Sequence, residues 1–171
     1  MTTKTNKQAK NLPSLTIGQA HGGGFYVGDI TDDGVKYHLI VAPKASGEAV
    51  KKWVDTVMVA TSKTNGPGNT SAILNNQTVT YPAAQFCADL RIGGFDDWYL
   101  PSKDELDVAC KARKALAAIG EAFAASYFWS STEYSTVYAW YQYFFSGNPG
   151  NQNHYTKTNG SYVRAFRRLA I

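Results

Sequence analysis

The first third of the chain contains short apolar clusters separated by glycine-rich breaks, a pattern that predicts β-strands. Residues 25–30 and 37–41 are rich in aromatic and β-branched side chains, which favour extended backbone. Asp33 and Gly34 lie between these clusters, and an Asp-Gly pair favours the tight turn of a β-hairpin. The sequence therefore predicts two paired strands that begin just after a run of three glycines.

Apolar residues in the middle of the chain recur with the helical spacing of three and four positions. A first helix is expected to begin at Ser46. Its apolar positions at i, i+3, i+4 and i+7 are Val50, Trp53, Val54 and Val57. Residues 61–69 contain a Gly-Pro-Gly run and are expected to form a loop. A second helix is expected over residues 81–90, which again carry an apolar stripe.

A third helix has the clearest start signal. Ser102 stands three positions before Glu105, the spacing of a capping box in which each side chain satisfies a backbone N–H of the first turn. Asp104 adds negative charge where the helix dipole is positive. The helix is expected to run from this cap to about Ala118.

The C-terminal third returns to the pattern of strands. Strands are expected over residues 128–131, 139–145 and 162–168, with a turn at 146–150. Alternation within the middle strand divides its large side chains between two faces. One face carries Trp140, Gln142 and Phe144, and the other carries Tyr141, Tyr143 and Phe145. Because strands near both ends flank the helices, the sequence predicts an α+β domain.

The domain organisation follows from length and polarity. The 171 residues are enough for one domain with a buried core. Residues 1–21 are polar with little periodicity and are expected to form an N-terminal arm that contacts other subunits or a particle, while residues 22–171 form the domain. The arm lacks the apolar segment of a secretory signal, and no stretch has the length and hydrophobicity of a membrane span. Membrane insertion is therefore not expected.

Charge and reactive side chains narrow the function classes. The net charge is +4, but no basic stripe interleaves with aromatic residues, so a nucleic-acid partner is not expected. The three histidines lie far apart and no serine–histidine–aspartate set is recognisable, so no metal, cofactor or catalytic site is expected. Cys87 and Cys110 fall on apolar helix positions, which favours two buried thiols over a disulfide.

A segment that is poor in charge and rich in Tyr, Asn and Ser covers residues 130–162. Between Glu133 and Arg164, Lys157 is the one formally charged residue. Tyrosine provides a large contact area at a small entropic cost, and Asn and Ser provide adaptable hydrogen bonds, as in binding surfaces. The alternative is that these aromatic residues belong to the core. The candidate ligand-binding residues are Ser131, Glu133, Tyr134, Tyr138, Tyr141, Tyr143, Asn148, Asn151, Asn153 and Tyr155.

Several side chains in and around this segment are expected to make structural contacts. Glu133 has two interpretations, since it would either accept hydrogen bonds from a ligand or pair with a C-terminal arginine. The C-terminal arginines are expected to pair with acids such as Asp96 or Asp97. These arginines are Arg164, Arg167 and Arg168. Trp98 and Trp129 are expected to be core anchors under the helices.

Three segments carry a resemblance to a known family. Residues 93–106 read GGFDDWYLPSKDEL, residues 128–133 read FWSSTE, and residues 163–168 read VRAFRR. With weaker pieces they make residues 22–171 resemble the C-terminal domain of collagen-like bacterial adhesins, also found in phage tail proteins and in the variable proteins of diversity-generating retroelements. The resemblance implies a C-type-lectin-like fold related to the formylglycine-generating enzyme, with short antiparallel sheets and two to three helices. It also implies that the first and last strands pair, so that the termini lie close together.

The resemblance implies recognition and not catalysis. The leading hypothesis is a receptor-binding or adhesin domain of a phage tail fibre or tail tip, which binds a bacterial surface glycan or protein through residues 130–162. The calcium-dependent motifs of sugar-binding lectins are missing from the sequence, so a metal-free site is expected. The expected location is the virion tail or an extracellular surface. The expected partners are the host cell-surface receptor, other virion or tail subunits, and copies of the chain in an oligomer such as a trimer. The alternatives are a virion decoration or connector protein and a retroelement variable protein.

Overall fold

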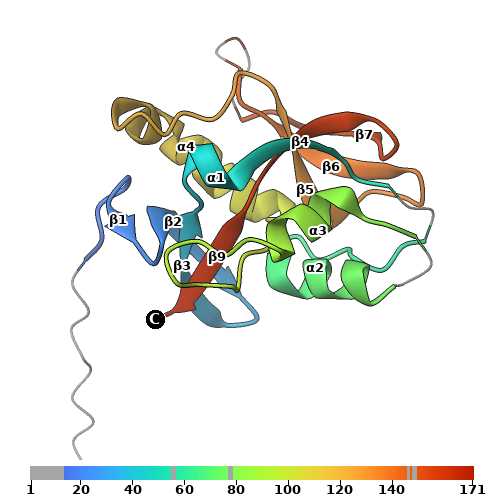
Figure 1. Cartoon of the computed structure of the whole chain (residues 1–171), viewed down its shortest axis with the longest axis horizontal. Helices are drawn as coiled ribbons and strands as arrows, with labels where there is room; N and C mark the ends of the chain where they lie inside the picture. The colour runs from blue at the N-terminus through green and yellow to red at the C-terminus, as the bar shows by residue number, and fades with distance from the viewer. Residues whose placement is uncertain (1–13, 55–56, 77–78, 146, 148–149) are drawn as a thin grey trace, which may run out of the picture.

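The structure is a computed structural model that describes residues 14–54, 57–76, 79–145, 147 and 150–171. Within these residues, nine strands form two sheets and four helices pack around them, which confirms the predicted α+β class (Figure 1). Four helices exceed the two to three that were expected, because one of them is a single turn. No helix in the described part of the chain is long and apolar enough to cross a membrane.

The first sheet contains the predicted hairpin. Its strands, in spatial order, are β1 (Ala20–His21), β2 (Gly24–Asp32), β3 (Val35–Val41) and β9 (Phe166–Ala170). Asp33 and Gly34 form the turn between β2 and β3, and both have positive φ angles, 47° and 77°. Asp and Gly are the residues that tolerate this backbone region, so the local sequence determines the hairpin.

The pairing of the last strand differs from the expectation. β9 pairs antiparallel with β3, whereas β1 pairs with β2 at the opposite edge of the sheet. The first and last strands therefore share a sheet but are not neighbours. A side chain still connects the two segments, because Arg167 in β9 donates a hydrogen bond to the carbonyl oxygen of Gly22, at 2.8 Å.

The second sheet holds five strands. In spatial order they are β4 (Glu48–Lys52), β8 (Gly160–Arg164), β5 (Tyr127–Glu133), β6 (Tyr138–Tyr143) and β7 (Gln152–Thr156). The predicted final strand, 162–168, is divided between the two sheets, because β8 ends at Arg164 and β9 begins at Phe166. Ala165 lies between them and exchanges backbone hydrogen bonds with Ala42 and Gly47. The last segment of the chain thus connects the two sheets.

The helix expected to begin at Ser46 is not formed. The chain makes the single-turn helix α1 (Lys44–Gly47) and then β4, which takes its backbone hydrogen bonds from β8. Alternation along the strand leaves Val50 56% exposed, so its apolar character does not mark a core position. Trp53 is fully buried and its indole N–H donates to the carbonyl oxygen of Ser130 at 2.8 Å. Of the four positions with helical spacing, Val50 lies in the edge strand β4 and the other three follow it, so the spacing does not correspond to a helix.

The loop expected over residues 61–69 contains the start of a helix. α2 (Gly66–Asn75) begins there, with Asn65 as its N-cap accepting a hydrogen bond from the backbone N–H of Gly68 at 2.7 Å. Pro67 lies in the first turn, where a missing N–H costs nothing. The Gly-Pro-Gly run that was expected to form a loop therefore belongs to the start of a helix. The predicted helix at 81–90 is confirmed in a shorter form as α3 (Pro82–Ala88).

The capping box at the start of α4 (Lys103–Ala118) is confirmed, and the helix ends where the sequence predicts. The side chain of Ser102 accepts from the backbone N–H of Glu105 at 3.4 Å, and the Glu105 carboxylate accepts from the Ser102 N–H at 2.8 Å. Both residues are fully buried, so water does not replace a lost partner.

Replacing Ser102 with alanine is expected to lower the free energy of unfolding by about 1 kcal/mol, because one backbone N–H of the first turn loses its acceptor. Urea denaturation of both proteins measures the difference. Ser71→Ala is the matched control, since Ser71 is an exposed residue within α2 and its loss is expected to cost less than about 0.5 kcal/mol. Equal effects of the two substitutions would contradict the role of the cap.

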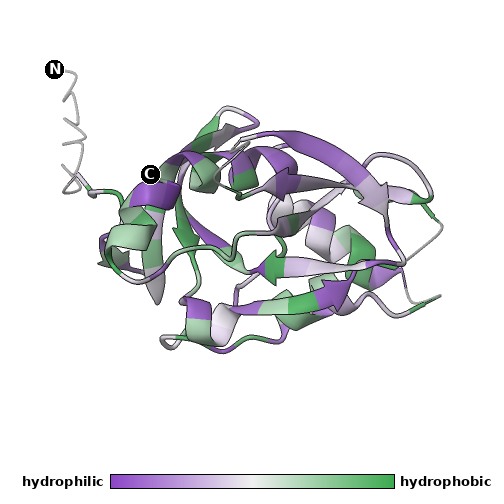
Figure 2. Cartoon of the chain, turned by 90° about the horizontal axis from the view of Figure 1, so that it is seen from above, coloured by the Kyte–Doolittle hydropathy of each residue, from purple (hydrophilic) through white to green (hydrophobic). Residues whose placement is uncertain are grey.

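The helices cover the two faces of the five-stranded sheet. Trp129 packs with residues of α2 and α3, whereas its neighbour Phe128 packs with residues of α4. Adjacent residues of a strand point to opposite faces, so α2 and α3 lie on one face and α4 on the other. Figure 2 shows that hydrophobic and hydrophilic stretches both occur along the strands and the helices.

The remaining core predictions are confirmed. Trp98 and Trp129 are buried. Cys87 lies in α3 and Cys110 in α4, and both are free, buried thiols. Burial raises the pKa of both thiols, so they stay protonated at neutral pH.

Candidate binding site

Pairing of β5, β6 and β7 brings four tyrosines onto one face of the sheet. Tyr127 is opposite Tyr143 in the register of β5 and β6, and Tyr141 is opposite Trp129 on the same face. Tyr155 on β7 pairs with Ala139, which alternation places on the same face as Tyr141. We call Tyr127, Tyr141, Tyr143 and Tyr155 the tyrosine cup. α2 and α3 cover the other end of this face, over β4, β8 and part of β5.

Three tyrosines of the cup, Tyr127, Tyr141 and Tyr155, line a pocket of about 250 Å³ together with Gly160. The rings of Tyr127 and Tyr141 are 5.0 Å apart and nearly perpendicular, at 77°. The rings of Tyr141 and Tyr155 are 6.2 Å apart at 84°. Fully buried Trp129 supports the cup from within the sheet, since its indole stacks with the ring of Tyr155 at 6.2 Å. The pocket therefore has rigid aromatic walls on strands.

The hydroxyl groups of the cup are partly satisfied within it. The Tyr141 and Tyr143 hydroxyl oxygens lie 2.9 Å apart, and either one can be the donor. Burial and this hydrogen bond raise the pKa of Tyr141 well above its usual range. The Tyr141 phenol is therefore neutral at physiological pH, and the residue lines the pocket although it is only 8% exposed.

A second aromatic cluster lies on the opposite face of the sheet. It consists of Tyr134, Tyr138, Trp140 and His154. The rings of Tyr134 and His154 stack at 3.9 Å with an interplanar angle of 8°. The Lys103 ammonium lies 4.3 Å from the centre of the Trp140 ring. The single surface predicted for residues 130–162 is therefore two surfaces, because alternation along β6 and β7 sends neighbouring aromatic residues to opposite faces.

Besides Tyr141, two candidate binding residues are buried, Ser131 and Glu133, and both make contacts within the protein. Ser131 donates its backbone N–H to Pro101 at 2.7 Å, and its hydroxyl accepts from the side-chain amide of Asn69 at 3.2 Å. Glu133 accepts a hydrogen bond from the Lys157 ammonium at 2.7 Å. The same carboxylate accepts from two backbone N–H groups, those of Val59 and Ala60, each at 2.7 Å. The predicted pairing of Glu133 with a C-terminal arginine is therefore wrong, because its partner is Lys157 and the residue is only 4% exposed.

The predicted asparagines lie in and beyond β7. Asn153 is exposed and pairs with Tyr141 in the register of β6 and β7, which places it beside the cup. Asn151 is exposed too, and its carbonyl oxygen accepts a hydrogen bond from the backbone N–H of Tyr143 at 2.9 Å. Asn148 lies outside the described residues. Tyr127 and Gly160 were missed as pocket residues, although the alternation of Tyr127 with Trp129 was a usable signal.

The C-terminal arginines form ion pairs. Arg167 makes a two-pronged contact with Asp97, with N–O distances of 2.7 and 2.9 Å, which confirms the predicted pairing. Arg164 is fully buried and pairs with Glu121. Arg168 pairs with Asp32 at 3.1 Å. These side chains attach the last strands to distant parts of the chain.

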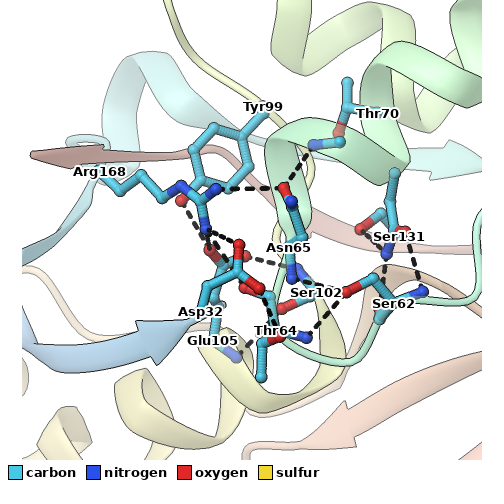
Figure 3. Close-up of polar contacts among 12 residues, drawn as sticks. Asp32, Ser62, Thr64, Asn65, Thr70, Tyr99, Ser102, Glu105, Ser131 and Arg168 are labelled. Carbon is cyan, nitrogen blue, oxygen red and sulfur yellow. Dashed lines mark hydrogen bonds and ion pairs between the residues drawn. The ribbon is translucent and has the colours of Figure 1, made fainter. Parts of the chain in front are cut away.

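A partly buried polar network joins the hairpin of the first sheet to α2 and α4 (Figure 3). Arg168 reaches Asp32 and also donates to the side-chain oxygen of Asn65 at 3.2 Å. The Tyr99 hydroxyl donates to the Glu105 carboxylate at 2.9 Å. Any side chain at position 66 would collide with Glu105 and Tyr99, so glycine is required where α2 begins against this network.

The network is structural in character. Burial raises the pKa of Glu105 to about 7, although hydrogen bonds from the Ser102 backbone and the Tyr99 hydroxyl oppose the rise. Glu105 and Tyr99 are buried, so a ligand in solvent does not contact them. No group of three or more His, Cys, Asp or Glu side chains within the described residues is arranged to hold a metal ion.

Comparisons with known proteins agree with this architecture. A model of the family described as the Lcl C-terminal domain matches residues 52–167, more than half of the chain. Among solved structures, a fimbrial protein from Bacteroides ovatus is similar in fold, with a TM-score of 0.57 and 16% sequence identity. The match covers 75% of this chain and 35% of that protein, so this chain spans about a third of its length. No curated protein matches the sequence.

Proposed function

Because the chain belongs to the Lcl C-terminal domain family, a C-type-lectin-like fold family, we propose that it is an adhesin-type module whose tyrosine cup binds a receptor on a bacterial surface. The observation that carries this choice of site is the pocket of about 250 Å³ between Tyr127, Tyr141 and Tyr155. The module binds and releases its receptor without a chemical step. Its receptor is a bacterial surface glycan or protein.

The physical basis of the proposal is a contact surface that is already ordered. Tyr127 and Tyr155 are 40% and 48% exposed, large areas for aromatic residues on regular strands. Their neighbours hold the rings in place, so little rotational entropy is lost when a ligand stacks on them. Asn153 lies beside them and supplies a polar group that can fix the orientation of a ligand.

The setting of the module is part of the proposal. We place it on a phage tail fibre, a tail tip or a comparable extracellular surface, in an oligomer such as a trimer, with the N-terminal residues contacting other subunits. An open pocket of this size gives modest affinity for a single copy. Several copies on one particle raise the overall affinity without any new contact.

The test compares tyrosines on the two faces of the same sheet. The full chain and its variants are labelled, coupled to beads in multiple copies, and measured for adsorption to a panel of bacterial strains. Tyr127→Ala with Tyr155→Ala is expected to reduce adsorption at least about tenfold, because hot-spot tyrosines contribute about 2 kcal/mol each. Tyr134→Ala with Tyr138→Ala, two exposed tyrosines on the opposite face, is the matched control and is expected to adsorb normally.

The outcome that contradicts the proposal is normal adsorption by the folded cup variant. Loss of adsorption by the control alone would move the site to the opposite face and reject the cup. Circular dichroism spectra of both variants establish that they are folded.

A further inference from the structure

Tyrosine rings form most of the wall of the pocket in the tyrosine cup. Three of the four residues that line the pocket are tyrosines of the cup, and the fourth is Gly160. Neighbouring tyrosine rings stand at 77° and 84° to one another. Ring faces carry the negative part of the aromatic quadrupole and attract cations. Rings at nearly right angles form adjacent walls, so one rounded group in the pocket can touch more than one ring.

The acceptors that the pocket walls offer to a ligand are neutral groups. The Tyr141 and Tyr143 hydroxyls bond to each other at 2.9 Å, so they are partly used. The lining residues include no carboxylate. A primary ammonium needs acceptors for its three N–H groups when it leaves water. A quaternary ammonium has no N–H group and loses no hydrogen bond on entering the pocket.

The volume of the pocket also favours a quaternary ammonium group. A pocket of about 250 Å³ is small for a folded peptide or a chain of sugars. It has room for a trimethylammonium group together with the first atoms of the chain that carries it. Such a group is rounded, apolar on its surface and positively charged, which suits a pocket walled by several aromatic rings.

We infer that the tyrosine cup binds a quaternary ammonium group, such as a choline head group carried by the receptor. This inference rests on the proposed function and names the chemical group that the cup recognises. The cation lies against the rings of Tyr127, Tyr141 and Tyr155, with Gly160 at the base or rim of the pocket where a side chain is absent. The rest of the receptor extends into solvent, beside Asn153.

The test uses three small probes that share a hydroxyethyl group, on the full chain. Choline chloride carries the quaternary cation, 3,3-dimethyl-1-butanol is its neutral isostere, and ethanolamine hydrochloride carries a primary ammonium. Isothermal titration calorimetry is expected to give saturable binding of choline, at least about tenfold tighter than either of the other two. Equal binding of the neutral isostere, or no saturable binding of choline, would overturn the inference.

Three variants separate the ring from its hydroxyl and the cup from the opposite face. Tyr155→Leu removes a ring and is expected to weaken choline binding at least about fivefold. Tyr155→Phe keeps the ring and is expected to bind choline within about threefold of the unchanged chain. Tyr134→Leu on the opposite face is the control and is expected to have no effect. Equal loss in Tyr155→Leu and Tyr134→Leu would reject the cup as the choline site.

Further measurements identify which molecule carries the quaternary ammonium group and separate a failure of this inference from a failure of the proposed function. Phosphatidylcholine vesicles present it on a lipid, and phosphocholine-conjugated albumin presents it on a soluble carrier; binding to neither contradicts the inference. If the adsorption of cells depends on Tyr155 but choline does not bind, the inference fails and the proposed function stands. If choline binds and the adsorption of cells does not depend on Tyr155, the proposed function fails.

Discussion

Replacing Lys157 with methionine is expected to lower the free energy of unfolding by about 3–5 kcal/mol, the cost of leaving a buried charge without its partner. The Lys157 side chain is 1% exposed and its ammonium lies 2.7 Å from the Glu133 carboxylate. It also donates to the carbonyl oxygen of Thr136 at 3.2 Å and lies 4.6 Å from the centre of the Trp53 ring. Methionine fills a similar volume, so the loss is electrostatic and not a cavity.

Guanidinium denaturation measures this loss of stability, and two further variants test whether its cause is the unpaired buried charge. Lys111→Met is the matched control, because the Lys111 side chain is 77% exposed and pairs with Asp107 on the surface of α4; its cost is expected to be below about 1 kcal/mol. Adding Glu133→Gln to Lys157→Met removes the uncompensated charge and is expected to restore part of the stability. A cost below about 1 kcal/mol for Lys157→Met, or a double variant that is less stable than Lys157→Met, would contradict this account.

The ion pair also matters for the site. Lys157 directly follows β7, the strand that carries Tyr155, and Glu133 ends β5, the strand that carries Tyr127. The Glu133 carboxylate further fixes the segment at Val59 and Ala60 through their N–H groups. The pair thus joins the strands that supply the walls of the cup, at a distance from the ligand itself. Variants of this pair are expected to weaken receptor binding through loss of order.

The protein is expected to lose stability as the pH rises from about 5 to about 7 through the titration of Glu105. Burial raises the folded-state pKa of this carboxyl from 4.5 to about 7, and hydrogen bonds from Ser102 and Tyr99 oppose the rise only in part. Between these values the folded protein holds a proton that the unfolded chain has released, so folding is favoured at the acidic end. The contribution is complete below about pH 4.5, is lost as the pH rises to about 7, and amounts to about 3 kcal/mol.

Glu105→Gln removes this titration and is expected to flatten the dependence of the free energy of unfolding on pH between about 5 and 7. Urea denaturation at a series of pH values measures the slope for both proteins. Asp89→Asn, a carboxyl-to-amide change at an exposed residue of the surface, is the matched control and is expected to keep the slope of the unchanged chain. An identical slope in Glu105→Gln and the unchanged protein would show that other groups govern this range of pH.

The amino-acid sequence was most informative where its signals act within a few residues. The hairpin at Asp33 and Gly34 and the cap at Ser102 depend on neighbouring backbone groups, and both are present in the structure. Alternation along 139–145 also gave the two faces correctly, since Gln142 and Phe144 are buried on the side of α4 while Tyr141 and Tyr143 belong to the cup. These features follow from turn geometry and strand periodicity, which are local properties of a chain.

Local signals were misleading where two states compete. Residues 50–57 carry helical spacing, yet residues 48–52 form β4 because β8, far along the chain, offers a complete row of backbone partners. The Gly-Pro-Gly run after Asn65 is compatible with a loop or with a helix start, and packing of α2 against β5 selects the helix. Propensity differences of a fraction of a kcal/mol per residue are too small to decide against such tertiary contacts.

For the binding segment, the sequence by itself determined that residues 130–162 are rich in tyrosine and nearly free of charge. Only the tertiary structure decided which of those tyrosines share a pocket, and it added Tyr127 and Gly160 from outside the predicted set. It also buried Glu133 by pairing it with Lys157. The physical reason is that a pocket is defined by the register of separate strands, and a register is fixed by hydrogen bonds and packing between segments that are distant in the sequence.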